Sequence, residues 1–559
     1  MQEPQKITLT PTTRLARALA HEQALQHTTA GQSAWRAEPV LAFSVWLNQL
    51  LEDYFLDADD PRTPISGDQA YEVWKSVIDT DIFIGEPRVA DLAERAWRLL
   101  HEYQLAAPRQ WPPLLMNGDN LRFQAWANEY QAVCRKRGWV DLHTWLEELP
   151  GLIQQGKVRP PQRLELAGFV LSPTPQQQRI IDACEQAGSA VVRMNQPSDR
   201  AVTAVQTYAA GRAKNELLAA ANWARGLLEQ DRHQHIAIIV PDLEGRVEQA
   251  ENALRRVFDP DGFVLHSDRV EPWHISLGKP LSRWPLTADA LAFLNLNPNR
   301  LSQPQIRRWL RSPFVHGWPE ESLARAEIVT TLARIAPYEL TLFELNRDGV
   351  AHAPCFQRTL KRWREARDTT ADRARPSAWT AQFQNELSAL GFGRGRTLNS
   401  QEHQLLARWQ RLLEQFSALD AVIEQPIRRP QALRLLAERA SRTIFRERNF
   451  GVPVEVLGLK EALGSDFDAI WMTSMDRDTW PPAARHEPLI PGKIQRSIAA
   501  ASSSGRLQQA QLELNAVLAA APVHVFSFCV DPEAPHEDRL TSMLSSSSSA
   551  CCALSLSID

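Results

Sequence analysis

Short apolar runs alternate with amphipathic segments in two parts of the chain. Between residues 163 and 194, the run LELAGFVL is followed by TPQQQRIIDACEQAG and then by SAVVRM. A buried strand, a helix capped by Thr174 with Pro175 at its first position, and a second strand form the usual order of a βαβ unit. The alternation returns in residues 205–258, where VQTYAA and HIAIIVP each precede a helical pattern. These patterns predict an α/β protein with parallel sheets.

The strongest strand pattern lies near the carboxyl end. The apolar runs Val454–Leu459 and Ala469–Met475 flank the polar sequence KEALGSDFD. Each run has the length of a strand that is buried on both faces, and Gly464 and Asp466 are residues typical of a turn. We therefore expect two neighbouring core strands.

The second of these runs leads into the sequence DRDTWPP. Pro481 and Pro482 cannot donate hydrogen bonds to a ladder, so the strand must end before them. In open α/β sheets, ligands bind at the carboxyl ends of the strands. We expect Asp476 and an exposed Trp480 to lie at such an edge.

Two long segments have a helical pattern. Residues 35–159 repeat apolar positions at i, i+3, i+4 and i+7, and residues 291–450 are helical and rich in arginine. Such arginine clusters are typical of solvated faces or of ion pairs within the protein. Tryptophans recur on the apolar faces of the first segment and are typical of a core: Trp46, Trp74, Trp97, Trp126 and Trp145.

These patterns divide the chain into two α/β cores, each interrupted by an all-helical insertion. The serine-rich end, with the sequence CCALSLSID, has no pattern typical of a core element and is predicted to be a disordered or aberrant tail. In chain order the division is 1–34 with 160–204 (first core), 35–159 (first insertion), 205–290 with 451–530 (second core), 291–450 (second insertion) and 531–559 (tail).

The composition limits the partners of the protein. Lys and Arg total 62, Asp and Glu total 66, and the formal net charge is −4, so any contact with nucleic acid must be local. The six cysteines form no CxxC pair, which fits a reducing compartment. The sequence contains no signal-peptide core and no long apolar run, and we predict a cytoplasmic protein without a membrane partner.

Motifs for catalysis and for cofactor binding are missing from the sequence. There is no G-x-x-x-x-G-K-[ST], and Gly278–Pro280 has a proline where the metal-binding Ser or Thr of that motif would stand. No Asp-Glu pair follows the apolar run 164–171 to hold magnesium. Pro241 and Asp242 spell half of a PD-(D/E)XK motif, but no (D/E)XK strand follows, and Asp242 is better explained as a helix N-cap. We predict no ATP hydrolysis and no catalytic, cofactor-binding or metal-binding residues.

The turn Leu463–Phe467 resembles the Lys-Gly-Leu-Glu-Phe turn in the late motif of UvrD-type helicases. Gly464, Asp466 and Phe467 stand on the glycine, the acid and the phenylalanine of that motif, and Leu463 replaces its lysine. With ITLTPTTRLARALA, S-x-G-x-P-L and L-R-S-P-F elsewhere, the chain resembles a bacterial family of AddB- and RecC-like DNA repair proteins. These are helicase-like chains with degraded ATPase motifs, commonly followed by a PD-(D/E)XK nuclease domain. The resemblance implies degenerate helicase-like, RecA-type parallel sheets with large all-helical insertions.

The resemblance also implies a function. It suggests an inactivated helicase-like scaffold subunit in DNA repair or recombination that binds DNA or a helicase–nuclease partner. Two alternatives stay open: the amino-terminal part of a nuclease whose catalytic domain is missing from this chain, or a protein-interaction subunit that does not bind DNA. Near-neutral charge favours the second alternative. The acid Glu216 falls on a family position at a strand-to-helix junction.

Candidate DNA contacts come from the predicted loops and from basic helices. Guanidinium groups suit phosphate oxygens, although arginines on a capped surface helix need no ligand. Thr12 or Thr13 is expected to cap the first helix. The candidates are Thr12, Arg14, Arg17, Arg307, Arg308, Arg311, Asp476 and Trp480.

Overall fold

The computed structural model describes most of the chain in two compact units. One unit comprises Met1–Leu277 and Asn449–Asp559, and the other comprises Gly278–Arg448. The predicted tail, residues 531–559, lies outside the described residues. The described residues are 6–32, 37–78, 87–194, 202–260, 271–335, 338–348, 352–368, 371–446, 451–477 and 479–529.

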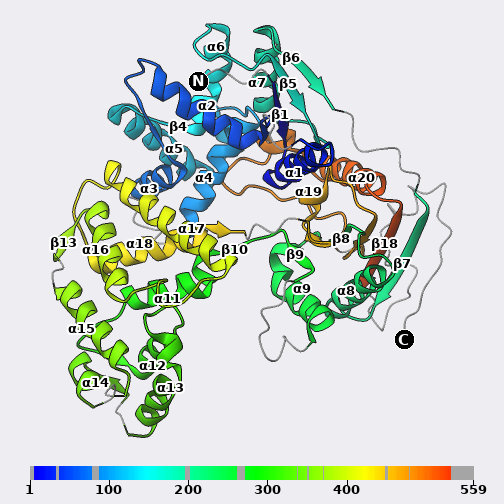
Figure 1. Cartoon of the computed structure of the whole chain (residues 1–559). Coiled ribbons are helices and arrows are strands. Elements are labelled where there is room, and N and C mark those ends of the chain that lie inside the picture. The colour runs from blue at the N-terminus through cyan, green and yellow to red at the C-terminus, as the bar shows by residue number, and fades with distance from the viewer. Residues whose placement is uncertain are drawn as a thin grey trace. The chain divides into compact units, whose positions relative to one another are not determined.

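The first sheet of the larger unit has parallel strands in the order β2-β1-β5-β6 (Figure 1). Helix α7 (Pro175–Gln186) joins β5 to β6, and Thr174 caps it as predicted. The Thr174 hydroxyl accepts from the backbone N–H of Gln177, and the Gln177 side chain accepts from the N–H of Thr174. The predicted βαβ unit is therefore present. The strands are β1 (Lys6–Thr10), β2 (Val40–Ala42), β5 (Arg163–Leu166) and β6 (Ala190–Arg193).

The segment between β2 and β5 is mostly helical, as predicted. A short parallel pair of strands, β3 (Thr63–Ile65) with β4 (Trp139–Asp141), corrects the expectation that it is helical throughout. All five tryptophans predicted to lie in its core are buried. The helices are α2 (Phe43–Asp57), α3 (Gly67–Ile78), α4 (Pro87–Glu102), η1 (Pro108–Gln110), η2 (Pro113–Leu115), α5 (Gly118–Arg137) and α6 (Leu142–Gln154).

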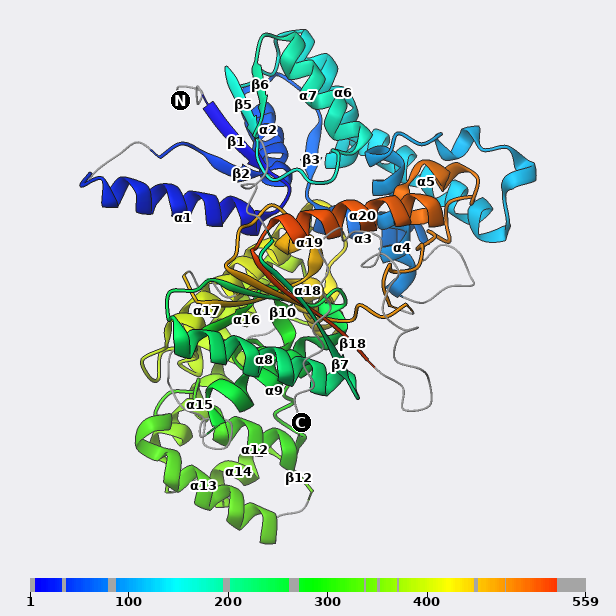
Figure 2. The ribbon, with the colours of Figure 1, turned by 90° about the vertical axis from the view of Figure 1, so that its right-hand side faces the viewer.

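The second sheet of this unit has six parallel strands in the order β7-β18-β17-β8-β16-β9. Figure 2 shows it between α8 (Ala213–Gln230) and α9 (Leu243–Phe258) on one side and α20 (Ser503–Ala519) on the other. Side chains of its central strands alternate between the two apolar layers, which explains their continuous apolar sequences. The strands are β7 (Ala204–Ala210), β8 (Ile236–Ile239), β9 (Trp273–Ile275), β16 (Val454–Leu457), β17 (Ala469–Met472) and β18 (Val523–Cys529).

The two predicted strands near the carboxyl end are present and buried, but they are not neighbours. Strand β8 lies between β16 and β17, and Ile238 is paired with Val456 on one side and with Trp471 on the other. Parallel strands require a crossover connection, and here the crossover contains one helical turn, α19 (Leu459–Ala462), and passes over β8. The strand predicted over 164–171 is also shorter than expected and ends at Leu166.

The second unit is helical, with three short antiparallel strand pairs in its described residues. Some of its arginines lie in internal ion pairs, as their clustering predicted: Arg367 and Arg429 both contact the buried carboxylate of Glu386, at 2.9 and 2.7 Å. The helices are α11 (Pro285–Leu294), α12 (Gln303–Arg311), α13 (Trp318–Ile335), α14 (Leu342–Asp348), α15 (Pro354–Asp368), α16 (Pro376–Ala389), α17 (Ser400–Ser417) and α18 (Arg429–Arg442).

The fold is thus α/β, with parallel sheets and large helical insertions. Among the described helices, none combines the length and the apolar character needed to cross a bilayer.

Candidate functional site

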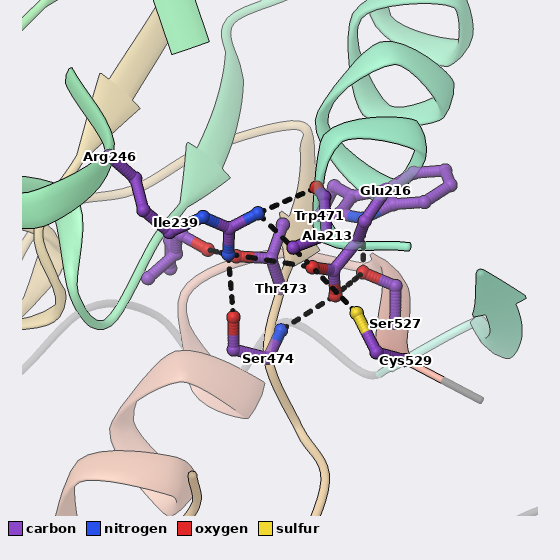
Figure 3. Close-up of polar contacts among 9 residues, drawn as sticks. All are labelled: Ala213, Glu216, Ile239, Arg246, Trp471, Thr473, Ser474, Ser527 and Cys529. Carbon is purple, nitrogen blue, oxygen red and sulfur yellow. Dashed lines mark hydrogen bonds and ion pairs between the residues drawn. The ribbon is translucent and has the colours of Figure 1, made fainter. Parts of the chain in front are cut away.

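A buried polar cluster lies at the carboxyl edge of the six-stranded sheet, where ligands bind in many α/β proteins (Figure 3). Its groups come from the first turns of α8 and α9, from the segment after β17 and from β18. They meet because carboxyl ends of parallel strands lie at one edge. We call Glu216, Arg246, Ser474, Ser527 and Cys529 the Glu216 cluster.

The carboxylate of Glu216 is the centre of this cluster, with a solvent exposure of 0 %. Its Oε1 accepts from the backbone N–H of Ser474 at 2.7 Å and from the Ser527 hydroxyl at 2.8 Å. Its Oε2 accepts from both terminal nitrogens of Arg246, at 3.5 and 3.4 Å. A buried carboxylate is tolerated when a cation and several donors replace water, and these contacts meet that requirement.

Ser474 has the unusual backbone conformation of this site. Its φ is +61°, in the left-handed region where non-glycine residues are uncommon. Its N–H is held by Glu216, and its hydroxyl accepts from Arg246 at 2.7 Å. The next residue, Met475, donates its N–H to the carbonyl of Ser527 at 2.9 Å. The cluster therefore stabilises a strained turn directly after β17.

The remaining groups of the cluster do not form a nucleophilic site. Burial, followed by the nearby charge of Glu216, raises the pKa of the Cys529 thiol to about 11. A thiol with such a pKa stays protonated near neutral pH and is a poor nucleophile. The Ser527 hydroxyl donates to Glu216 and accepts from the Trp471 indole at 2.8 Å. The arrangement suits a structural role at the sheet edge.

The loop after β17 differs from its prediction. Trp480, expected to be exposed, has a solvent exposure of 0 %, and the Arg506 guanidinium lies 5.7 Å from its ring centroid. The cause is a tight turn at Asp476, whose carbonyl accepts from the N–H of Trp480 at 2.8 Å and whose carboxylate accepts from the N–H of Thr479 at 3.1 Å. This turn directs the indole into the core, so the expectation of an exposed ring is wrong.

The first strand and helix meet in a short turn. Only Pro11 and Thr12 separate β1 from α1 (Thr13–Thr29). The Thr12 hydroxyl accepts from the N–H of Leu15 at 3.2 Å, which confirms Thr12 as the predicted cap. The helix start is therefore closed by its own side chain.

Arg14, in the first turn of α1, is bound to the six-stranded sheet and its connections. Its Nε donates to Glu455 at 2.9 Å, and one terminal nitrogen donates to the hydroxyl of Ser465 at 2.8 Å and to the carbonyl of Glu461 at 3.1 Å. Burial alone would raise the pKa of Glu455. The hydrogen bonds from His235 and Arg14, together with the positive charge of Arg14, have the larger effect and lower this pKa to about 2. Arg14 thus serves an internal ion pair in this structure.

A close backbone contact lies beside this ion pair. Gly168 and Gly464 have φ of +73° and +79°, and a Cβ added to Gly464 would lie 2.8 Å from the Cα of Gly168. A side chain at Gly464 would therefore require movement of the backbone, whereas one at Gly168 would first displace the side chain of Leu15. The turn predicted at Gly464 is therefore present, and its glycine also permits the approach of the two parallel sheets.

The other predicted contacts are distributed over both units. Arg17 is exposed on α1, and Arg307 and Arg311 are exposed on α12 in the second unit. Arg308 instead forms an ion pair with Asp289 at 2.7 Å. The predicted residues are therefore not brought into one site within either unit.

Asp242 lies at the start of a helix, as predicted, but does not form the predicted capping hydrogen bond. It is the N-cap residue of α9, but its side chain makes no capping hydrogen bond. Arg246, one turn later, supplies the important contact of this helix end.

Sequence reasoning missed four members of the Glu216 cluster: Arg246, Ser474, Ser527 and Cys529. Ser527 is a polar residue inside an apolar strand that is buried on both faces, and a polar side chain at such a position indicates a buried hydrogen-bond partner. Arg246 is a cation in the first turn of a helix, where the helix dipole is unfavourable and a partner is expected. Ser474 carries no such pattern, because glycine or asparagine would be expected at its φ.

No group of three or more His, Cys, Asp or Glu residues suited to a metal ion is found in the part of the chain that the structure describes. A comparison with known protein families and a search of curated proteins return no match to this chain. The AddB- and RecC-like resemblance therefore stays a prediction from the sequence.

Proposed function

We propose that this chain is an inactivated helicase-like scaffold subunit of DNA repair or recombination. It binds DNA or a helicase–nuclease partner and does not hydrolyse ATP. The observation that carries the proposal is the closed turn between β1 and α1, together with the contact of Arg14 with Glu455.

A nucleotide-driven motor needs an open helix start after such a strand. Backbone N–H groups of a glycine-rich loop surround the phosphates, and a lysine contacts them. Here the turn consists of Pro11 and Thr12, proline has no N–H, and the Thr12 side chain already accepts from Leu15. The lack of a phosphate-loop motif in the sequence supports the same conclusion.

The contacts between the two sheets support a static role. Motor cycles require two bodies to open and close around a ligand. The pair of Arg14 with Glu455 joins α1 to a strand of the six-stranded sheet, and the contact of Gly168 with Gly464 joins connections of the two sheets. Opening would break this partly buried ion pair together with the hydrogen bonds of Arg14 to Ser465 and to the carbonyl of Glu461, which opposes movement.

ATP turnover and DNA binding by the purified chain test this proposal. We expect no DNA-stimulated release of phosphate, and retention of a labelled single-stranded oligonucleotide that weakens as salt increases. A known DNA-dependent ATPase in the same buffer is the positive control. DNA-stimulated turnover that co-purifies with the chain would overturn the proposal.

The alternative of a protein-interaction subunit is favoured by one observation. Two of the five arginines that are candidates for phosphate contact, Arg14 and Arg308, instead form ion pairs within the protein. This alternative predicts no retention of DNA even at low salt, so the same binding experiment separates the two functions.

A further inference from the structure

A cavity of about 610 Å³ lies in the larger unit, between η2 and the segment that leads into α20. The residues important for its chemistry are Leu114, Leu115, His486, Lys493, Arg496 and Ser503, and we call it the basic pocket. None of the residues that line it is acidic. Its volume is in the range of small-ligand sites and suits roughly one or two nucleotides.

No acid of the described residues neutralises the positive charge of the basic pocket through an ion pair. Lys493 and Arg496 are exposed, and in the described part of the chain neither forms an ion pair. The acid nearest to them in sequence, Glu487, is buried, and its carboxylate accepts from the Nε of Arg95 at 2.5 Å. The imidazole of His486 adds a further hydrogen-bonding group to the lining. Among the residues that line the pocket, an anion therefore finds two cations and no carboxylate.

The segment that carries these cations is held in place by a buried amide. The Gln495 side chain accepts from the N–H of Glu487 at 2.8 Å and donates to the carbonyls of Glu487 and Ile490, at 3.1 and 2.8 Å. The Asn120 amide of α5 donates to the carbonyl of Pro488 at 3.2 Å. Figure 2 shows the orange segment before α20 beside α5. The backbone that carries the two cations is therefore already ordered, so binding costs mainly the conformational entropy of their side chains.

An apolar side chain stands at the same cavity. Leu114 has a solvent exposure of 99 % and projects from η2. A ligand with both a phosphate and an apolar part would contact Lys493 and Arg496 with the first and Leu114 with the second. Nucleotides of a single strand have this composition, because each phosphate is next to a sugar and a base with apolar faces.

We propose that the basic pocket binds phosphate groups of a single DNA strand through Lys493 and Arg496, with Leu114 against the adjacent sugar or base. The proposal rests on the DNA-binding form of the proposed function and names the surface that performs it. The chemistry recognised by the cations is the phosphate group, whether it belongs to a strand or to a small molecule.

Fluorescence anisotropy with a fluorescein-labelled oligothymidylate tests the site. The variant Lys493→Ala with Arg496→Ala is expected to bind about tenfold more weakly or worse. Its slope of log affinity against log salt should fall by about 1.4, since each lost contact with a single strand accounts for about 0.7. The matched control is Lys361→Ala with Arg362→Ala, an exposed Lys-Arg pair on α15 that loses the same charge and should bind as the unchanged protein does.

Two further measurements distinguish a strand from a small phosphate ligand. Calorimetric titration with inorganic pyrophosphate should show binding that is lost in the Lys493→Ala, Arg496→Ala variant. Leu114→Ser should weaken oligothymidylate binding about three- to tenfold, because it removes an apolar contact, and should leave pyrophosphate binding unchanged.

The outcomes separate the pocket from the wider function. DNA binding that is equal in the pocket variant and in the control overturns the pocket and leaves the DNA-binding scaffold standing. Pocket-dependent pyrophosphate binding without any DNA binding supports the phosphate site and overturns its occupation by a strand. An absence of both kinds of binding overturns the pocket and the DNA-binding function together.

Discussion

Glu216 and Arg246 form a buried ion pair across the carboxyl edge of the six-stranded sheet, with 3.4 Å between carboxylate and guanidinium. The pair links the first turn of α8 to the first turn of α9 and fixes the turn at Ser474. In many α/β proteins this edge binds a ligand, whereas in this chain the polar groups of this corner contact one another. The pair is therefore a structural element at a place usually associated with function.

The first prediction concerns the loss of this pair. Glu216→Ala should lower the free energy of unfolding by about 3–5 kcal/mol, because it leaves the guanidinium of Arg246 buried without its partner. Thermal unfolding followed by circular dichroism should show a lower midpoint. Glu229→Ala is the matched control, because Glu229 lies on the same helix, is 63 % exposed and forms a surface ion pair with Arg225. It should change stability by less than about 1 kcal/mol. Equal midpoints for the two variants would contradict a stabilising role of the cluster.

The second prediction concerns pH. The pKa of Glu455 is lowered from 4.5 to about 2 in the folded protein, so the unfolded state binds a proton more readily. The stabilisation from this carboxylate is fully present above about pH 4.5 and is lost as pH falls toward about 2. At neutral pH it amounts to about 3 kcal/mol.

Urea unfolding at a series of pH values measures this contribution. The difference in free energy of unfolding between the unchanged protein and Glu455→Gln should be constant near neutral pH and shrink below about pH 4.5, since the glutamine cannot titrate. A difference that does not change with pH would show that the charge of Glu455 is unimportant for stability.

Much of the fold follows from local patterns in the sequence. Thr174 and Pro175 predicted the start of α7, and the apolar run Ala469–Met475 predicted β17 as a strand that is buried on both faces. The order of the strands in the sheet could not be predicted in this way, because β8, from a distant part of the sequence, lies between β16 and β17. Hydrophobic periodicity describes one element at a time and contains no information on its partners.

The site was less predictable for a related reason. Charged residues in loops were interpreted as ligand contacts, yet Arg14 contacts Glu455, which is 441 positions away in the sequence. Trp480 was expected to be exposed because it lies in a charged loop at the carboxyl edge of the sheet, but the turn at Asp476 returns it to the core. Whether a polar side chain has an internal partner depends on tertiary contacts, and these are invisible in a single sequence.

The third prediction concerns the contact of the two sheets. Gly464→Ala should destabilise the protein by roughly 2–4 kcal/mol, because its φ of +79° disfavours a side chain and its Cβ would lie 2.8 Å from the Cα of Gly168. Gly451→Ala is the matched control, since its φ is +70° and nothing lies within 4 Å of an added Cβ. The control should lose only about 1 kcal/mol from its backbone conformation. If chemical denaturation shows equal losses of unfolding free energy for the two variants, the close contact of Gly464 with Gly168 does not limit the side chain at this position.

The fourth prediction concerns the arginines of α12 and follows from the proposed DNA binding. Arg307 and Arg311 are exposed, so Arg307→Ala with Arg311→Ala should weaken binding of single-stranded DNA about tenfold without a change in the unfolding midpoint. Arg308→Ala should act on stability instead, because it removes the ion pair with Asp289 at 2.7 Å. Anisotropy titrations and thermal unfolding of the same preparations separate the two effects. If the double variant binds DNA as the unchanged protein does, the predicted contact at α12 is wrong, and DNA binding must depend on other surfaces.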